Sequence, residues 1–182
     1  MISFLQHDHF GGINTLLYAL TSGSTLIIPK DRSPATVCET IEKHKVTLLP
    51  TTPSFLKFMM MVRAHDRHDL SSLKLITYGS EKMEGWVLKL LNIAMPNAEL
   101  KQTYGLSELG VLHAKSKGSN SLWVKVGGPG FETKVENGTL WVKSESSMLG
   151  YLDGTDPFKD GWYDTGDLVD VDGEYVRFMG RR

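Results

Sequence analysis

Apolar and polar positions follow two different patterns along the chain, one before and one after about residue 120. In the first part, short apolar runs alternate with stretches in which apolar residues recur at helical spacing. The expected strands cover residues 2–6, 25–28, 46–49 and 73–77, and the expected helices cover residues 12–19, 34–44, 53–62 and 83–94. Alternation of this kind predicts a mainly parallel sheet covered by helices.

Two of these helices have clear start signals in the sequence. Ser33-Pro34 and Thr52-Pro53 each place a hydroxyl at the N-cap position and a proline in the first turn. Gly23 follows the first expected helix and Pro96 follows the fourth, and both residues are typical of helix ends. We therefore expect helices that are bounded by local sequence.

From about Ser121 onward, apolar and polar residues alternate, as they do in strands with one buried face. Asn137-Gly138 and Asp172-Gly173 lie between such runs and predict hairpin turns. This pattern predicts an antiparallel β-rich, barrel-like lobe packed on the first region. The fold class is therefore α/β, with an α/β subdomain at residues 1–118 and a β-rich subdomain at residues 119–182.

Composition limits the possible binding partners and the expected cellular location. The formal net charge is −1, and no run of Lys or Arg exceeds two residues, which argues against nucleic acid or an anionic membrane as the main partner. Cys38 is the single cysteine, so an internal disulfide is excluded and a cytoplasmic location is expected. Polar residues interrupt the apolar stretch at residues 13–28, so we expect no membrane span.

Two short motifs carry the candidate chemistry. Tyr104-Gly105-Leu106-Ser107-Glu108 combines an aromatic ring, a glycine, a hydroxyl and a carboxylate. Tyr163-Asp164-Thr165-Gly166-Asp167 ends in an acid that a Thr-Gly turn would leave free to bind a ligand. Together these groups could stack on a base, contact a phosphate, hold magnesium and accept hydrogen bonds from ribose hydroxyls, which points to a nucleotide.

These motifs stand in order with three further ones along nearly the whole chain. The set is Asp8-His9-Phe10-Gly11-Gly12, Tyr78-Gly79-Ser80-Glu81, Gln102-Thr103-Tyr104-Gly105-Leu106-Ser107-Glu108, Gly161-Trp162-Tyr163-Asp164-Thr165-Gly166-Asp167 and Gly180-Arg181. In this order the chain resembles part of the large domain of the acyl-adenylate-forming family. That family includes acyl-CoA synthetases, peptide-synthetase adenylation domains and firefly luciferase.

The resemblance implies roles for individual residues. Tyr104 would stack on adenine, Ser107 would bond the α-phosphate, and Glu108 would hold Mg²⁺, so Ser107 and Glu108 are the implied catalytic residues. Gly79 and His9 would border the acyl pocket. The implied nucleotide-binding residues are Gly79, Ser80, Glu81, Gln102, Thr103, Tyr104, Gly105, Ser107, Asp167 and Arg181.

The resemblance also implies a reaction and its cofactors. A small carboxylic acid would attack the α-phosphorus of ATP, with Mg²⁺ present, to give acyl-AMP and pyrophosphate, and coenzyme A would commonly accept the acyl group. The family's phosphate loop and its lysine-bearing C-terminal domain have no counterpart in the sequence, and both stabilise developing charge. We therefore expect a segment of a longer ligase, inactive alone, whose partners include those two missing parts.

One stretch imitates the family's phosphate loop. Thr21-Ser22-Gly23-Ser24-Thr25 is followed by Pro29-Lys30, but Leu26-Ile27-Ile28 lies between them and favours a strand. The stretch also follows residues 8–12, whereas the family's loop precedes them. We interpret it as a helix end followed by a strand.

Other interpretations remain open on sequence alone. Residues 104–108 could form a strand-to-helix turn capped by Ser107, Asp167 could close a turn, and Arg181 could belong to a solvated terminus. An alternative from a different class is a nucleotide- or acyl-binding module without catalysis. A third alternative is a metal-dependent hydrolase that uses clustered histidines.

The histidine alternative rests on two separate clusters. His7 and His9 form the first, and the second combines histidine and aspartate at residues 65–69. Neither cluster has a cysteine pair or a His-Glu-x-x-His helix to support a zinc site. We interpret the second cluster as a solvated loop between a helix and a strand.

Overall fold

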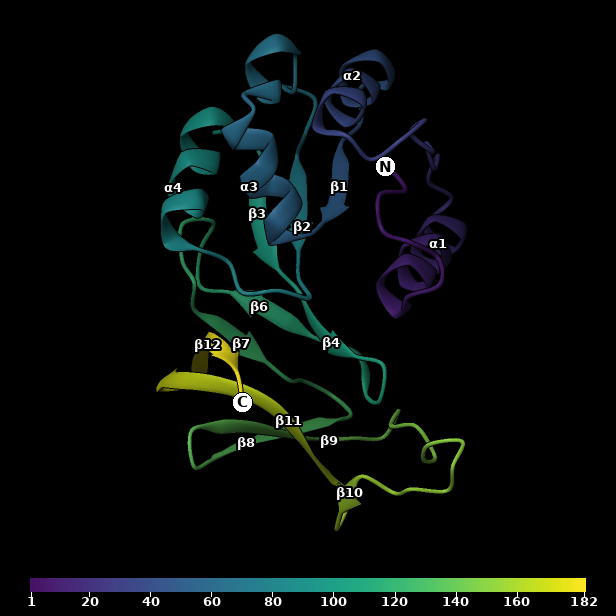
Figure 1. Ribbon diagram of the computed structural model, residues 1–182, viewed down its shortest axis with the longest axis vertical. Helices are drawn as coiled ribbons and strands as arrows, with labels where there is room; N and C mark the ends of the chain where they lie inside the picture. Colours follow the sequence, from purple (N-terminus) through teal and green to yellow (C-terminus); the bar gives the residue numbers. More distant parts are fainter.

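The computed structural model describes residues 1–182 as two regions of different architecture (Figure 1). The α/β region has a parallel sheet in the order β1 (Leu48–Thr51), β2 (Leu75–Tyr78) and β3 (Glu99–Gln102). Its helices are α1 (Phe10–Ser22), α2 (Pro34–His44), α3 (Pro53–Met61) and α4 (Gly85–Ala94), with a short 3₁₀ helix η1 (Ala64–Arg67). The predicted α/β class with a parallel sheet is confirmed.

The helix starts follow the capping signals. The Ser33 hydroxyl accepts a hydrogen bond from the Thr36 amide, and the Thr52 hydroxyl accepts one from the Phe55 amide, both at 3.3 Å. Gly23 ends α1 in the left-handed conformation and returns its amide to the Ala19 carbonyl. Local chemistry therefore determines where these helices begin and end.

The core of the α/β region forms between the sheet and α2, α3 and α4. Leu49, Ile76 and Leu100 lie side by side on the three strands and are almost completely buried. They belong to a cluster of 22 buried residues that also includes apolar residues of all three helices. This core holds the carboxyl ends of β1, β2 and β3 in fixed positions.

Two expected strands are reduced to single contacts. Ile2 and Ile27 form an isolated parallel bridge, and the Ile2 amide donates to the Leu48 carbonyl at 3.2 Å. Neither segment continues as a strand, because Pro29 lacks a donor and the residues before α1 turn into the helix. The prediction of full strands at residues 2–6 and 25–28 is therefore wrong.

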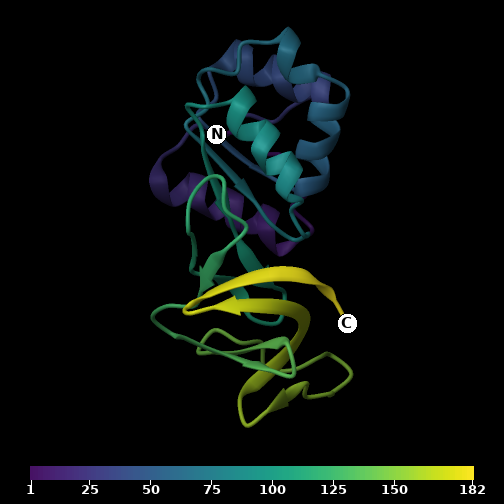
Figure 2. The same ribbon diagram turned by 90° about the vertical axis from the view of Figure 1, so that its left-hand side faces the viewer.

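The β-rich region is a curled antiparallel sheet (Figure 2). Its strand order is β6 (Ala114–Ser116), β7 (Val124–Val126), β12 (Tyr175–Arg181), β11 (Trp162–Asp172), β9 (Thr139–Ser144) and β8 (Phe131–Glu136), and β10 (Phe158–Lys159) pairs with β11. Asn137 and Gly138 have φ angles of 50° and 75° between β8 and β9, and Gly173 has 60° between β11 and β12. The predicted turn at Asn137-Gly138 is confirmed, whereas the second turn lies one residue later than predicted, at Gly173-Glu174, because Asp172 pairs with Tyr175.

A short hairpin of β4 (Tyr104–Leu106) and β5 (Gly110–Leu112) lies between the two sheets. No helix follows residues 104–108, so the strand-to-helix interpretation is wrong. The chain reverses at residues 107–109 so that Leu106 pairs with Gly110, which has φ = 80°. Antiparallel pairing therefore begins at Tyr104, ahead of Gly118.

The Thr-Gly turn expected before Asp167 is a bulge instead. β11 runs through it, with Asp164 paired to Trp141 and Leu168 paired to Thr139 on β9. Gly166 has φ = 71° within this irregularity, which suits a residue without a side chain. Pairing on both sides of the bulge keeps the strand direction, so the motif bends the strand and does not reverse it.

None of the helices is long and apolar enough to cross a membrane.

Candidate nucleotide site

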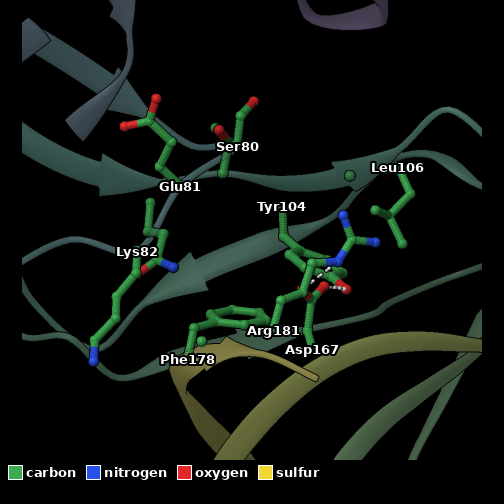
Figure 3. Close-up of a pocket in the computed structure, with 12 residues that line it drawn as sticks. Ser80, Glu81, Lys82, Tyr104, Leu106, Asp167, Phe178 and Arg181 are labelled. Carbon is green, nitrogen blue, oxygen red and sulfur yellow. Dashed lines mark hydrogen bonds and ion pairs between the residues drawn. The ribbon is translucent and has the colours of Figure 1, made fainter. Parts of the chain in front are cut away.

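A cavity of about 230 Å³ lies where the loop after β2, the strand β4 and the strand β12 meet (Figure 3). Its lining combines small polar groups and the charged side chains of Glu81 and Lys82 from the α/β side with charged and aromatic groups from the β-rich side. The lining residues are Ser80, Glu81, Lys82, Gln102, Thr103, Tyr104, Gly105, Leu106, Asp167, Phe178, Gly180 and Arg181.

The polar centre of the cavity joins residues that are far apart in sequence. The Tyr104 hydroxyl donates to Asp167 Oδ2 at 2.7 Å, and Arg181 Nε lies 3.5 Å from Asp167 Oδ1. The Asp167 side chain is 16% exposed, whereas Arg181 is 63% exposed. Asp167 is thus held from both sides while part of it still faces the cavity.

The bulge in β11 explains the position of Asp167. The Thr165 hydroxyl donates to the Leu140 carbonyl at 2.7 Å and accepts from the Asp167 amide at 3.1 Å. Arg181 also donates from Nη2 to the Thr165 carbonyl at 3.1 Å. A buried threonine therefore fixes the bend that points Asp167 toward Tyr104.

Burial and a neighbouring charge keep Tyr104 protonated. The pKa of Tyr104 is raised far above its ordinary value, first because the hydroxyl is desolvated and then because the Asp167 charge lies beside it. The hydroxyl therefore remains a hydrogen-bond donor to Asp167 at neutral pH.

Phe178 and Lys82 line the cavity but were not predicted as site residues. The Phe178 ring stacks on Tyr104, with ring centroids 4.7 Å apart and planes 20° apart. Lys82 Nζ donates to the Met179 carbonyl at 3.0 Å and so connects the loop after β2 to β12. The alternation in residues 174–178 marked Phe178 only as an apolar strand residue, and no sequence pattern marked Lys82.

The loop after β2 packs closely on the start of β4. A Cβ atom on Gly79 would lie 2.4 Å from Thr103 Oγ1 and 2.8 Å from the Thr103 carbonyl oxygen, so a larger residue does not fit. Ser80 has φ = 68°, an uncommon conformation for a residue with a side chain. Glu81 accepts hydrogen bonds from the Ser54 amide at 2.9 Å and from the Ser54 hydroxyl, so it also holds the start of α3.

A second cavity, of about 350 Å³, adjoins the first. His9, Gly79 and Ser107 line it, and it shares Ser80, Thr103, Tyr104, Gly105 and Leu106 with the first cavity. His9 precedes α1 without capping it through its side chain. The two cavities are therefore separated by the residues that the motifs had singled out.

Glu108 takes a different position from the other predicted site residues. It lies in the turn between β4 and β5, where Glu108 Oε1 accepts a hydrogen bond from the Tyr151 hydroxyl at 2.9 Å. It lines neither of the two cavities. The structure thus brings Tyr104, Asp167 and Arg181 together at the first cavity, whereas Glu108 lies outside both cavities.

The second histidine cluster is only partly exposed to solvent. His65 belongs to η1 and is 13% exposed, and its Nε2 lies 3.0 Å from Asp66 Oδ1. His68 is 21% exposed, and its Nδ1 lies 2.9 Å from Glu42 Oε2 on α2. The solvated-loop interpretation holds for Asp66 and Asp69, which are exposed, but not for the two histidines, because α2 packs beside this segment.

The residues that imitate a phosphate loop belong to the end of α1. The hydroxyl of Thr21 donates to the Leu17 carbonyl at 2.9 Å, and that of Ser22 donates to the Tyr18 carbonyl at 2.6 Å. The interpretation as a helix end is confirmed. These two hydroxyls already donate hydrogen bonds to carbonyl groups of the helix.

Comparison with known proteins agrees with the motifs and the fold. The family model described as AMP-binding enzyme matches residues 1–152. The 4-coumarate–CoA ligase 5 of Oryza sativa subsp. japonica is 27% identical over 188 residues, which cover 90% of this chain and 35% of the ligase. The 2-succinylbenzoate–CoA ligase of Staphylococcus aureus (strain MRSA252) is 26% identical over 198 residues, which cover 100% of this chain and 39% of that ligase.

A solved structure shares the arrangement of both regions. The luciferase-like enzyme from the nonluminescent Zophobas morio mealworm superposes with a TM-score of 0.75 at 25% identity, covering 99% of this chain and 48% of that chain. The chain therefore spans at most about half the length of the proteins it matches. Because the family model covers most of its residues, the chain belongs to the acyl-adenylate-forming family of AMP-binding enzymes.

Proposed function

We propose that the first cavity binds the adenosine part of ATP in an AMP-forming ligase that activates a carboxylic acid. The observation that carries this proposal is the contact between Tyr104 and Asp167, which are 63 positions apart, beside Arg181 at one cavity. A carboxylate has about four lone-pair sites for hydrogen bonds, so Asp167 can accept the ribose hydroxyls in addition to Tyr104.

The base would stack on Tyr104, whose ring is supported by Phe178 on one face. Gly79 lets the loop after β2 lie directly against Thr103, so backbone groups of this loop can approach the edge of the base. Gln102, Thr103 and Gly105 complete this side of the cavity. Arg181 would contact the ribose from its exposed position.

The second cavity would hold the acid to be activated, with His9 and Gly79 at its border. A carboxylate oxygen of the acid attacks the α-phosphorus, the bond to the leaving pyrophosphate breaks, and acyl-AMP forms. Ser107 lines this cavity beside Tyr104, from where its hydroxyl would donate to the α-phosphate. Coenzyme A would then accept the acyl group.

Glu108 would hold Mg²⁺ in this reaction. A carboxylate oxygen is a ligand that Mg²⁺ prefers, and the ion usually takes its remaining ligands from water and substrate phosphates. Mg²⁺ would neutralise charge on the phosphates. The Tyr151 hydroxyl donates only to Oε1 of Glu108, so the remaining lone pairs of the carboxylate would be available to the ion.

We further propose that the chain binds nucleotide without completing adenylation by itself. Phosphoryl chemistry depends on groups that surround the transferred charge, and the hydroxyl-rich stretch at residues 21–22 is committed to the end of α1. The α/β subdomain at residues 1–118 and the β-rich subdomain at residues 119–182 would act as the two sides of the adenosine site.

Titration of the purified chain with AMP by calorimetry tests the proposal. We expect saturable binding, and Asp167→Asn should weaken it at least tenfold, or about 1.4 kcal/mol. Asp172→Asn is the matched control, because Asp172 lies on the same strand, pairs with Lys117 and is far more exposed. A folded chain that binds no AMP at millimolar concentration contradicts the proposal, as does equal weakening by the two variants.

A further inference from the structure

A loop that is distant in sequence holds the turn that contains Glu108. This loop joins β9 to β10, covers residues 145–157 and runs beside the hairpin of β4 and β5 (Figure 1). The Met148 amide donates to the Glu108 carbonyl at 2.8 Å, and the Ser146 hydroxyl donates to the Leu109 carbonyl at 3.2 Å. The loop therefore fixes two backbone carbonyls of the turn.

The same loop also reaches the side chain of Glu108. The Tyr151 hydroxyl donates to Glu108 Oε1 at 2.9 Å, across 43 positions of sequence. Tyr163 on β11 lies close to both groups. The pKa of Tyr163 is raised, first because its hydroxyl is desolvated and then because Tyr151 and Glu108 lie beside it. The carboxylate of Glu108 is therefore surrounded by phenol groups from the β-rich region.

Hydrogen bonds within the loop determine the position of Tyr151. Its amide donates to the Thr155 carbonyl at 3.0 Å, and its carbonyl accepts from the Gly154 amide at 2.9 Å. Leu149 and Leu152, on either side of Tyr151, are fully exposed, so apolar burial does not hold this part of the loop. The turn at residues 151–155 therefore fixes the backbone from which the tyrosine side chain extends.

We propose that Tyr151 is a positioning residue that holds the Glu108 carboxylate in the orientation in which it binds Mg²⁺. This inference rests on the proposed function, in which Glu108 is the metal ligand. Carboxylates that bind metals are themselves hydrogen-bonded by neighbouring groups, which orient them. The bond from Tyr151 engages only Oε1, so the ion and the phenol can share the carboxylate.

A phenol suits this role better than a charged donor. Glu108 forms no ion pair within the chain. A lysine or arginine in the place of Tyr151 would offset the negative charge that attracts the cation, whereas a hydroxyl orients the carboxylate and leaves its charge in place. A glutamate side chain also loses rotamer freedom when it binds an ion. The bond to Tyr151 supplies part of that ordering in advance.

A role as an anchor for the loop alone explains fewer of these contacts. Met148 and Ser146 already join the loop to the hairpin through backbone carbonyls, and Tyr151 is 42% exposed. An anchor could bond any acceptor of the hairpin, whereas the Tyr151 hydroxyl bonds the carboxylate of Glu108. The two roles also differ in outcome, because an anchor affects folding and a positioning residue affects the response to metal.

The effect of Mg²⁺ on nucleotide affinity tests the proposal. The probe is an ATP analogue with a methylene group between the α- and β-phosphorus, titrated into the chain by calorimetry with excess Mg²⁺ and again with EDTA. The ratio of the two dissociation constants is the metal effect. We expect Tyr151→Phe to reduce the metal effect about tenfold, as loss of such a hydrogen bond does at metal sites. Its affinity for AMP in EDTA and its melting temperature should stay close to those of the original chain.

Two variants provide controls for Tyr151→Phe. Tyr175→Phe removes a hydroxyl from a tyrosine that packs against Lys117 and lines neither cavity. Leu152→Ser changes a fully exposed residue of the same loop and leaves the contact with Glu108 in place. Both should keep the full metal effect. Equal loss of the metal effect in Leu152→Ser and Tyr151→Phe would overturn the proposal, and so would a Tyr151→Phe chain that does not fold, because it would identify Tyr151 as a structural anchor.

Glu108→Gln separates this inference from the proposed function. Glutamine still accepts a hydrogen bond from Tyr151 but lacks the charge, so the metal effect should disappear. Adding Tyr151→Phe should then change nothing further, because positioning acts only through the carboxylate. A metal effect that is absent from the original chain, or that survives Glu108→Gln, contradicts the metal role of Glu108 and the inference with it. A metal effect that is lost in Glu108→Gln but intact in Tyr151→Phe overturns the positioning role alone.

Discussion

The α/β region and the β-rich region contribute to the same cavity in different ways. The α/β region has the larger core, with 22 buried residues against ten, and it lines the cavity with small polar groups such as Ser80 and Thr103 and with the charged side chains of Glu81 and Lys82. The β-rich region supplies Asp167 and Arg181 on a bulged strand and its neighbour. The α/β region therefore provides most of the buried core, while the β-rich region provides the carboxylate that we propose binds the ribose. Substitutions in the two cores should separate these properties.

The largest expected effects come from deleting core side chains. Leu88→Ala on α4 and Leu140→Ala on β9 each remove a side chain that is at most 1% exposed. Each should lower the free energy of unfolding by about 2–5 kcal/mol through lost burial and a residual cavity. Urea unfolding, followed by fluorescence, measures both changes.

Only Leu140→Ala should also weaken AMP binding. The Leu140 carbonyl accepts from the Thr165 hydroxyl that fixes the bulge of Asp167, so loosened packing there reaches the site. Leu88 packs in the α/β core and contacts neither cavity. Equal loss of AMP affinity in both variants, measured well below the unfolding transition, would contradict a division of labour between the regions.

The second expected effect concerns the contact between Tyr104 and Asp167. Tyr104→Phe keeps the ring and its stacking on Phe178 but removes the hydroxyl that donates to Asp167. A hydrogen bond to a charged group contributes about 1.5–3 kcal/mol, so the free energy of unfolding should fall by about that amount. Thermal and urea unfolding measure it.

A double-mutant cycle gives the control for Tyr104→Phe. In an Asp167→Asn background, the same tyrosine change should cost clearly less, because the charged acceptor is gone. An equal cost in both backgrounds would mean that Tyr104 stabilises the chain through packing alone.

Sequence-based prediction succeeded where the determining interaction is local. Ser33 and Thr52 cap the helices that they were predicted to start, because each bond spans three residues. Asn137-Gly138 likewise forms a turn through its own backbone preference. The same reasoning failed at residues 2–6, where strand formation depends on partners elsewhere in the chain.

Prediction of the site was likewise limited by contacts between residues that are distant in sequence. The motifs indicated Tyr104 and Asp167 as candidates, but their direct contact across 63 positions is visible only in the structure. Phe178 and Lys82 were missed because neither belongs to a motif, and tertiary packing alone brings them to the cavity. Glu81 was predicted for nucleotide binding, and its bond to Ser54 adds a structural role that no local pattern encodes.

A smaller effect is expected from the helix caps of the α/β region. Thr52→Ala should lower the free energy of unfolding by about 1 kcal/mol, because the Phe55 amide loses its acceptor. Ser33→Ala in α2 is the matched change and should cost a similar amount. Urea unfolding compares them, and a Thr52→Ser variant should restore most of the loss. Failure of serine to restore it would assign the effect to the lost methyl group.

The smallest effect compares two exposed aspartates, one in each region. Asp69 accepts from the Ser71 amide at 3.0 Å and Asp153 accepts from the Thr155 amide at 2.9 Å, but only Asp69 has a lysine, Lys45, at 3.1 Å. Hydrogen bonding from Ser71, and then from Lys45, lowers the pKa of Asp69 to about 2. Hydrogen bonding from Thr155 lowers the pKa of Asp153 as well.

The sign of the resulting pH dependence follows from these shifts. Because the folded pKa of Asp69 is below the unfolded value of about 3.9, its stabilisation is present above that pH and is lost as the pH falls toward 2. Carboxyl NMR titration should show that Lys45→Ala raises the pKa of Asp69 only part of the way, since the Ser71 bonds remain. A return to the ordinary value in Lys45→Ala would mean that the ion pair, and not the turn that both regions share, holds this carboxylate in its charged form.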